Sequence, residues 1–182
     1  RKTYKILICR KYMTVLKRLV KKSEQNLFTK GPEAATPEKQ IEIINQLVAQ
    51  NVAGIAIAAN DADALQPALT EAMDAGIKVI SLDSAVNKDS RQTHIQQADP
   101  EKIGRGLIQA AYEMVDGNGG IAVLSATAQA TNQNLWIEWM KKELEENPEK
   151  YANTPLVKVA YGDDDPTKST SETQVTFDRF IN

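Results

Sequence analysis

The sequence is poor in the residues on which most metal and nucleophilic sites depend. Its single cysteine, Cys9, can form neither an internal disulfide nor a cluster of thiolate ligands. Its single histidine, His94, cannot by itself supply the His-rich site of a zinc enzyme or complete a Ser-His-Asp triad. We expect Cys9 to be a small buried strand residue and His94 to lie at a strand edge or on the surface.

Long apolar runs and nucleotide-binding fingerprints are also absent. No stretch approaches the roughly 20 apolar residues that a membrane span needs. The first residues lack the apolar centre of a signal peptide, so we expect such a leader to be absent or already removed. The segment Gly117–Gly120 precedes a predicted strand instead of opening a helix, so it predicts a turn and not a phosphate-binding loop.

Charge is distributed unevenly along the chain. Residues 1–30 contain ten Lys or Arg and one acidic residue, whereas the remainder contains twelve basic and twenty-three acidic residues. Such a division indicates either a basic arm for nucleic acid or anionic lipid, or two regions of different origin. Within the basic region, residues 11–27 have the apolar spacing of an amphipathic helix, which could lie on a membrane.

Strand-like and helical patterns alternate along most of the chain. The predicted order is strand 3–9, helix 11–27, turn-rich connection 29–40 with a helix starting at 37, strand 53–59, helix 61–76, strand 77–82, extended 93–98, helix 99–115, strand 119–126, helix 132–147, strand 155–161 and the opening of a helix at 165–174. This alternation predicts an α/β fold in which helices flank parallel sheets with right-handed crossovers.

Polar side chains follow the predicted strands, at the edge where ligands bind in open parallel sheets. These residues are Arg10, Lys11, Asn60, Asp61, Asp83, Ser84, Thr131, Asn132, Gln133, Asn134 and Asp163–Asp165. Carboxylates, amides and a lysine are suited to holding sugar hydroxyls, because together they accept and donate several hydrogen bonds. Asn60 and Asp99 are also explained as helix caps and Asp163–Asp165 as a solvated turn, whereas Asp83 follows an apolar strand and precedes no clear helix.

Two enzyme interpretations of Asp83 fail on the sequence. A dehalogenase-type phosphotransferase needs a second acid two residues after the nucleophile, and Ala85 occupies that position. A response-regulator phosphoacceptor needs an acidic pair after the first strand, where Arg10 and Lys11 stand instead. A sugar-modifying enzyme that uses Asp83 and Asp163–Asp165 as paired carboxylates remains an alternative, which turnover would distinguish from binding.

Three blocks of sequence resemble a known family. Residues 35–86, which end in GIKVISLDSAV, are followed by ATNQNLWIEWMKKELEENP and YGDDDPTKS. In this order they are similar to periplasmic sugar-binding proteins of ABC transporters, in the branch with rhamnose-binding and autoinducer-2-binding proteins. The resemblance covers residues 34–174. It implies the type I periplasmic-binding fold, with an N-terminal lobe at 1–98 and part of a C-terminal lobe at 99–182 that close over a sugar.

The resemblance also implies the ligand contacts. They are Asp83 after the "ISLD" strand, Asn132 and Gln133 before the helix of the second lobe, and Lys11 shortly after the first strand. Trp136 and Trp139 follow on that helix and are expected to face the core. No catalytic residue, cofactor or metal is implied. The expected partners are a small sugar, rhamnose-like or autoinducer-2, and a membrane permease, and the expected location is periplasmic or cell-surface.

Two segments depart from the family pattern. Residues 12–30 are basic where the family has a Gly- and Phe-rich loop, and the tail 175–182 does not resemble a continuing helix, although the family continues for nearly as long again. Our hypothesis is a disturbed reading frame at both places, testable by translating the other frames of the DNA. It predicts an incomplete second lobe that is unstable or self-associating. The alternatives are therefore a non-binding remnant, or the sugar-sensing domain of a LacI-type regulator. Because only two residues stand before TYKILIC, we expect no DNA-binding headpiece and no nucleic-acid partner.

Overall fold

The structure is a computed structural model, and it describes residues 4–6, 27–32 and 36–180. Lys11, Cys9 and nearly all of the helix predicted at 11–27 lie outside these residues. The chain divides into two compact units, residues 1–97 and 98–182, and each is described by itself. Within the described ranges, none of the helices combines the length and the apolar character that crossing a membrane requires.

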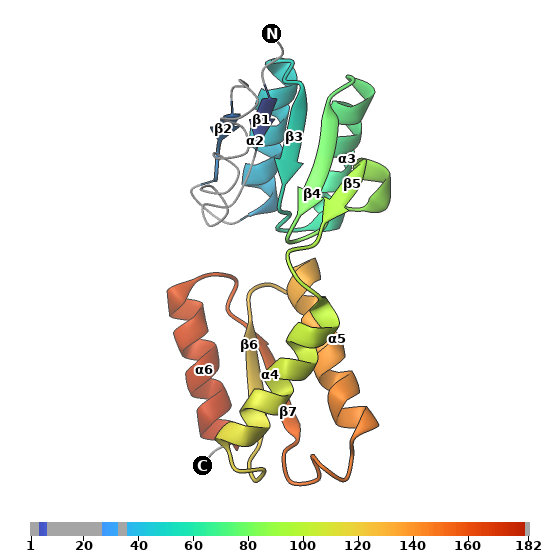
Figure 1. Ribbon diagram of the computed structural model, residues 1–182. Helices are drawn as coiled ribbons and strands as arrows, with labels where there is room; N and C mark the ends of the chain where they lie inside the picture. The colour runs from blue at the N-terminus through green and yellow to red at the C-terminus, as the bar shows by residue number, and fades with distance from the viewer. Residues whose placement is uncertain (1–3, 7–26, 33–35, 181–182) are drawn as a thin grey trace. The chain divides into compact units, whose positions relative to one another are not determined.

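Unit 1 contains parallel strands that form one layer. The strands are β1 (Tyr4–Ile6), β2 (Leu27–Thr29), β3 (Gly54–Ile57), β4 (Lys78–Leu82) and β5 (Thr93–Ile95). β1 pairs with β2, and β3, β4 and β5 pair in that order, all in parallel. β1 also contacts β3, so the layer runs β2-β1-β3-β4-β5 (Figure 1). The parallel arrangement predicted from the alternating pattern is confirmed.

The strand β2 corrects the sequence interpretation. Leu27 had been assigned to the end of a helix and Thr29 to a turn-rich connection, but Leu27–Thr29 pairs with Tyr4–Ile6. A strand of three residues is too short to show the two-residue periodicity that distinguishes a strand in sequence. Its formation depends on pairing with a distant partner, which no local pattern reveals.

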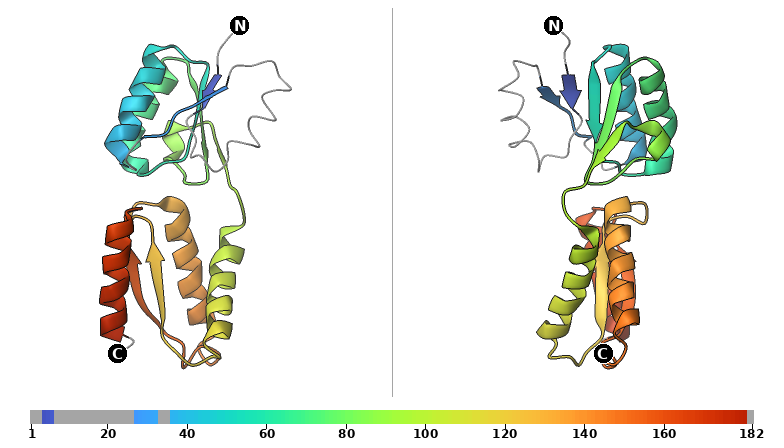
Figure 2. Two further views of the ribbon diagram at one scale, coloured as in Figure 1. Left: turned by 90° about the vertical axis from the view of Figure 1, so that its left-hand side faces the viewer. Right: turned by 45° about the vertical axis from the view of Figure 1, so that its right-hand side comes forward.

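Two helices of unit 1 begin and end as their sequence signals predict. The helix α2 (Pro37–Ala49) begins after Thr36, whose hydroxyl oxygen accepts a hydrogen bond from the backbone N–H of Lys39. The helix α3 (Ala62–Asp74) is followed by Gly76, whose φ of 83° is the left-handed conformation that ends many helices. α2 and α3 pack together on one face of the sheet (Figure 2).

The core of unit 1 lies between these helices and the sheet. Its most deeply buried side chains come from α2, α3, β3 and β4: Ile44, Leu47, Ile55, Ile57, Leu65, Leu69 and Val79. After β4 the chain passes through a short 3₁₀ helix, η2 (Lys88–Ser90), before it returns as β5. Val86 is buried in the same core and anchors the loop that follows Asp83.

The described residues of unit 2 form two strands and three helices. They are α4 (Pro100–Met114), β6 (Ile121–Ser125), α5 (Thr131–Glu146), β7 (Leu156–Tyr161) and α6 (Pro166–Phe180). β6 and β7 pair in parallel. α4 and α5 pack against each other on one side of the strands, and α6 contacts β6 and β7 from the other side (Figure 2). The N-cap predicted at Asp99 is confirmed, because its carboxylate accepts from two backbone N–H groups of α4.

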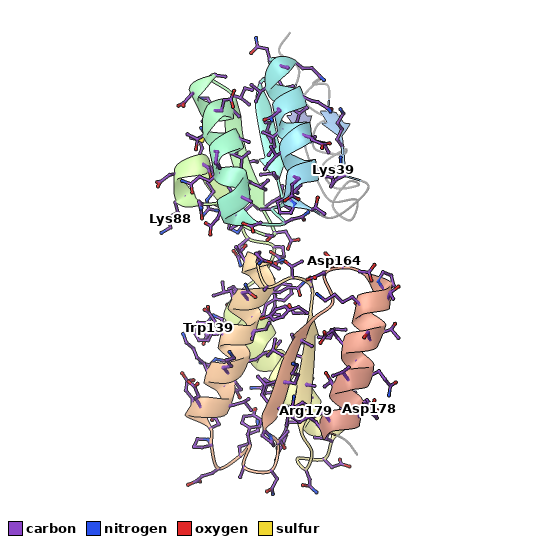
Figure 3. The ribbon with its side chains drawn as sticks, turned by 180° about the vertical axis from the view of Figure 1, so that it is seen from behind. Lys39, Lys88, Trp139, Asp164, Asp178 and Arg179 are labelled. Atoms are coloured by element: carbon purple, nitrogen blue, oxygen red, sulfur yellow. The ribbon has the colours of Figure 1, made fainter. Side chains whose placement is uncertain are left out.

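The tail corrects a second expectation. Residues 175–180 had been expected not to continue a helix, yet α6 extends to Phe180. Asp178 and Arg179 project from its last turn (Figure 3). Thr, Val and Phe have low helix propensity, which hid the helix in the sequence. Contact of α6 with β6 and β7, where Thr176 is buried, outweighs that propensity.

A buried charged network links α4 to α5. The Glu143 carboxylate is buried and accepts hydrogen bonds from Arg105 (2.9 Å), Gln109 (3.2 Å) and Tyr151 (2.8 Å). Burial alone would raise the pKa of Glu143, but these three hydrogen bonds outweigh it and lower that pKa below its usual value. Arg105 also pairs with Glu101 and Glu146, and these carboxylates hold its pKa above the usual value.

Candidate functional site

The carboxyl end of β4 places Asp83 in an unusual backbone conformation. Asp83 has a φ of 61°, in the left-handed region that non-glycine residues adopt rarely. Such a conformation costs on the order of 1–3 kcal/mol and persists only where surrounding contacts enforce it. Here the Asp83 N–H donates to the Ile95 carbonyl of β5 (3.2 Å), and the neighbouring Ser84 carbonyl accepts from Ala59 N–H (3.1 Å). The sheet therefore fixes the turn that carries this half-buried carboxylate.

Asn60 lies at the neighbouring strand end, after β3. Its backbone N–H donates to the side-chain oxygen of Gln40, and the Gln40 amide donates to the Ala58 carbonyl, both at 2.8 Å. The N-cap of α3 is Asp61, whose carboxylate accepts from the N–H groups of Asp63 and Ala64. Asn60 is therefore not the cap of this helix. Gln40 was not predicted as part of the site, because a glutamine within a helix gives no sign that it is buried against a strand end.

In unit 2, Gln133 and Asn132 come together at the start of α5. The Gln133 side-chain oxygen accepts from the hydroxyl of Ser125 and the backbone N–H of Ala126, both at 2.8 Å. The Asn132 side-chain oxygen accepts from the Gln133 N–H (2.7 Å). Because Gln133 uses its oxygen to hold the end of β6, its amide NH₂ is the part suited to donating to a ligand.

The turn after β7 is organised by its own aspartates. Asp163 and Asp164 both have positive φ, 52° and 54°, and Asp164 lies in the turn before α6 (Figure 3). Asp165 accepts from the N–H of Lys168 at the start of α6 (2.7 Å). Asp163 forms an ion pair with Lys168, and this bond raises the pKa of the Lys168 ammonium. Two of the three carboxylates of the predicted acidic turn thus have structural roles.

Of the two tryptophans of α5, which were both expected to face the core, Trp136 does so, whereas Trp139 is not part of the core cluster. Trp136 packs against the hydrophobic core of unit 2. Trp139, which projects from α5 (Figure 3), has the Lys142 ammonium 4.1 Å and the Arg105 guanidinium 5.1 Å from its ring centre. Both rings are therefore engaged with neighbouring side chains of unit 2.

The predicted ligand residues are thus distributed over both units. Asp83 belongs to unit 1, Asn132 and Gln133 are adjacent in unit 2, and Lys11 lies outside the described residues. In the described part of the chain no group of three or more His, Cys, Asp or Glu could hold a metal ion. A carboxylate and two amides at strand ends are groups that can bind hydroxyls of a small polyol.

The chain matches the model of a known domain family, described as periplasmic binding protein domain, over residues 11–179. The match includes all of the basic segment 12–30 and most of the tail 175–182, both of which had been expected to depart from the family pattern. It also extends beyond the range 34–174 over which the resemblance was recognised.

Solved structures agree with this match. An ABC transporter solute-binding protein from Clostridium phytofermentas with bound L-rhamnose is 39% identical, with a TM-score of 0.87 over 97% of this chain and 57% of its own. A sugar ABC transporter protein from Actinomyces odontolyticus is 32% identical, with a TM-score of 0.64 over 97% of this chain and 59% of its own. LsrB from Clostridium saccharobutylicum in complex with AI-2, at 22% identity, shares the fold, with a TM-score of 0.81 over 98% of this chain and 59% of its own.

This chain thus spans less than two thirds of the length of these three relatives. Within that span, the order of strands and helices is the one the resemblance implied, with parallel sheets flanked by helices. The domain match covers well over half of the chain, and two of the relatives exceed 30% identity over nearly all of it. The chain therefore belongs to the family of periplasmic binding proteins and has its type I fold.

Proposed function

We propose that this chain acts as the substrate-binding component of a carbohydrate ABC import system. Its ligand is a small sugar, its partner is a membrane permease, and it works in the periplasm or at the cell surface. Membership of the periplasmic binding protein family supports this role, as does 39% identity to a solute-binding protein with bound L-rhamnose. It binds the sugar and does not transform it.

The observation that carries the proposal is the conformation of Asp83. Asp83 holds a half-buried carboxylate at the end of a buried strand, in a left-handed turn that the sheet enforces, and such conformations cluster at functional sites. In the proposed site Asp83 accepts hydrogen bonds from sugar hydroxyls, and the amides of Asn132 and Gln133 add donors. Lys11 is proposed as a further contact.

We propose a neutral deoxysugar such as rhamnose as the ligand, in preference to autoinducer-2. Position 132 carries a neutral amide, where an aspartate would add a second negative charge beside the ligand. An amide both donates and accepts, so it suits a neutral sugar ring with alternating hydroxyls.

Calorimetry with L-rhamnose, D-arabinose and AI-2 tests the proposal directly. We expect saturable binding of L-rhamnose and a loss of about 10- to 100-fold in affinity for Asp83→Ala, because a hydrogen bond to a charged group contributes about 1.5–3 kcal/mol. Asp89→Ala is the matched control, since Asp89 is an exposed aspartate in the short helix η2 that follows Asp83. Absence of binding to every sugar, or equal affinity of Asp83→Ala and the parent chain, would contradict the proposal.

A further inference from the structure

His94 connects the last strand of the described sheet of unit 1 to the strand beside it. It lies in β5, opposite Ser81 of β4 (Figure 1), which confirms the strand-edge position expected from the sequence. The imidazole Nδ1 lies 2.8 Å from the Ser81 hydroxyl oxygen, and Nε2 lies 2.9 Å from the side-chain oxygen of Gln96. The Arg91 guanidinium donates to the same Ser81 hydroxyl (2.9 Å). A completely buried hydroxyl therefore stands between an imidazole and a cation.

These contacts assign one tautomer to the uncharged ring of His94. An arginine can only donate, so Arg91 uses one lone pair of the Ser81 oxygen. The single hydroxyl proton of Ser81 is then directed to the imidazole, whose Nδ1 accepts it. Nε2 therefore carries the ring proton and donates it to the side-chain oxygen of Gln96. Each donor meets an acceptor in this chain of hydrogen bonds, but only while His94 is uncharged.

Protonation of His94 turns Nδ1 from an acceptor into a donor. The Ser81 hydroxyl proton then loses its acceptor, and the Ser81 oxygen receives two donors that both carry positive charge. A buried donor without a partner and two like charges at one oxygen both oppose this arrangement. The hydrogen-bonded link between β4 and β5 is therefore strongest when histidine is uncharged, and it weakens as the pH falls through the range in which histidine takes up a proton.

The other charged groups nearby do not replace this link. Between β3 and β5, the charged side chains at this end of the sheet are Asp61, Asp63, Asp83, Lys88, Asp89 and Arg91. Asp61 caps α3, and Asp63 accepts from the side-chain amide of Asn87. Arg91 is the one that the structure joins to the imidazole, through Ser81, so a proton on His94 adds charge beside a cation.

The link reaches Asp83 through one backbone hydrogen bond. Ile95 follows His94 in β5, and its carbonyl oxygen accepts from the N–H of Asp83 (3.2 Å). That bond helps to hold the left-handed turn that carries the Asp83 carboxylate. β5 has three residues, fewer than the roughly five or six that are usual, so each contact that fixes it matters to its pairing. Loss of the contact between His94 and Ser81 therefore loosens the turn of Asp83.

We propose that His94 is a positioning residue for Asp83 and makes the proposed binding site sensitive to pH. The uncharged ring holds Ser81, so β5 stays paired and the turn of Asp83 is preserved. The charged ring releases Ser81, so the turn loosens and the affinity for a sugar falls. Only the effect on affinity rests on the proposed function, whereas the effect on the turn does not.

The test follows His94 and Asp83 together by NMR in the 182-residue chain without sugar. His94 is the one histidine of the sequence, so no other histidine ring signal overlaps with its own. The pH is varied from about 5.5 to 8, the range in which histidine ordinarily changes charge. We expect the protection of the Asp83 amide against hydrogen exchange, corrected for the intrinsic effect of pH, to fall as the His94 ring gains its proton. The expected decrease is about five- to tenfold, which corresponds to one net hydrogen bond.

Three variants separate the roles of the side chains. His94→Asn keeps an acceptor near the Nδ1 position but cannot take up a proton, so it should make the protection of Asp83 independent of pH. Ser81→Ala removes the shared hydroxyl and should lower that protection near pH 8 to the value of the parent chain near pH 5.5. Asp89→Asn, which removes an exposed charge from η2, is the control and should keep the parent's response. Circular dichroism establishes that each variant is folded before the comparison.

Constant protection of Asp83 while the His94 ring titrates would overturn the proposal, as would a His94→Asn variant that responds to pH like the parent. Titration with L-rhamnose at the same pH values tests the effect on affinity, which should fall by a similar factor in the parent and not in His94→Asn. A rhamnose affinity that ignores the charge of His94 would refute the pH sensitivity of binding. If no sugar binds at any pH, the proposed function fails, and the exchange measurement still decides whether His94 positions Asp83.

Discussion

At the scale of single residues, the strand ends combine binding groups with groups that hold them. Asp83 is fixed by β5 and by the loop after β3, and Gln133 fixes the end of β6 with the same side chain that is proposed to contact the sugar. Different substitutions of Gln133 can separate its structural role from its proposed role in binding. The side-chain oxygen of Gln133 serves the fold, and its NH₂ is the group proposed for the ligand.

Two substitutions at position 133 should therefore give different results. Gln133→Glu keeps an acceptor for Ser125 and Ala126 but removes the NH₂ donor, so we expect little change in stability and weaker sugar binding. Gln133→Ala removes the acceptor as well and should cost about 1–3 kcal/mol, because the buried donors lose their partner. Urea unfolding and sugar titration of both variants measure this. Equal loss of stability in the two variants would refute the assignment of the oxygen to the fold.

At the scale of elements, local signals were predictable and long-range partners were not. Thr36 and Asp99 act as N-caps as the sequence predicts, because a cap is decided within four residues. The strand Leu27–Thr29 and the last turns of α6 were missed, because both depend on distant strands. For the same reason, Asp83 could be predicted as a strand-end carboxylate. The hydrogen bonds from Gln40 to the end of β3 and from Arg105 to Glu143 could not be predicted, because they join residues far apart in the sequence.

Two glycines of α4, Gly104 and Gly106, test how closely α4 packs against α5. A Cβ on Gly104 would lie 2.5 Å from both the Trp136 carbonyl oxygen and the Trp139 Cβ, whereas a Cβ on Gly106 would meet nothing within 4 Å. We expect Gly104→Ala to destabilise unit 2 by about 1–3 kcal/mol, because α4 and α5 must separate. Gly106→Ala should stabilise it by about 0.5–1 kcal/mol through helix propensity alone.

Urea unfolding followed by tryptophan fluorescence measures both changes in unit 2, since Trp136 and Trp139, the two tryptophans of the chain, belong to α5. The opposite signs of the two substitutions are the critical result. A stabilising Gly104→Ala would mean that α4 and α5 do not approach each other as the structure describes.

At the scale of the whole molecule, the described residues form two separate hydrophobic clusters, one in each unit. The core of unit 1 consists of aliphatic side chains, whereas unit 2 adds the buried Glu143 network to a smaller cluster. The two units should therefore respond differently to acid. Unit 2 depends on a buried carboxylate that must stay ionised, whereas the hydrophobic cluster of unit 1 is built from apolar side chains.

The sign of this acid response follows from the lowered pKa of Glu143. A carboxyl group whose folded pKa is below its unfolded value contributes stability that is fully present above the unfolded pKa, near 4.3 for glutamate. That contribution is lost as the pH falls from there through the folded pKa. We therefore expect the urea midpoint from tryptophan fluorescence to fall steeply between about pH 5 and the folded pKa.

Glu143→Gln should be less stable by about 1–3 kcal/mol at pH 7 and should show a shallower dependence of stability on pH. Glu138→Gln, which changes an exposed carboxylate on the same helix, should retain the parent's slope. If Glu143→Gln kept that slope unchanged, the acid sensitivity would have to originate from another group.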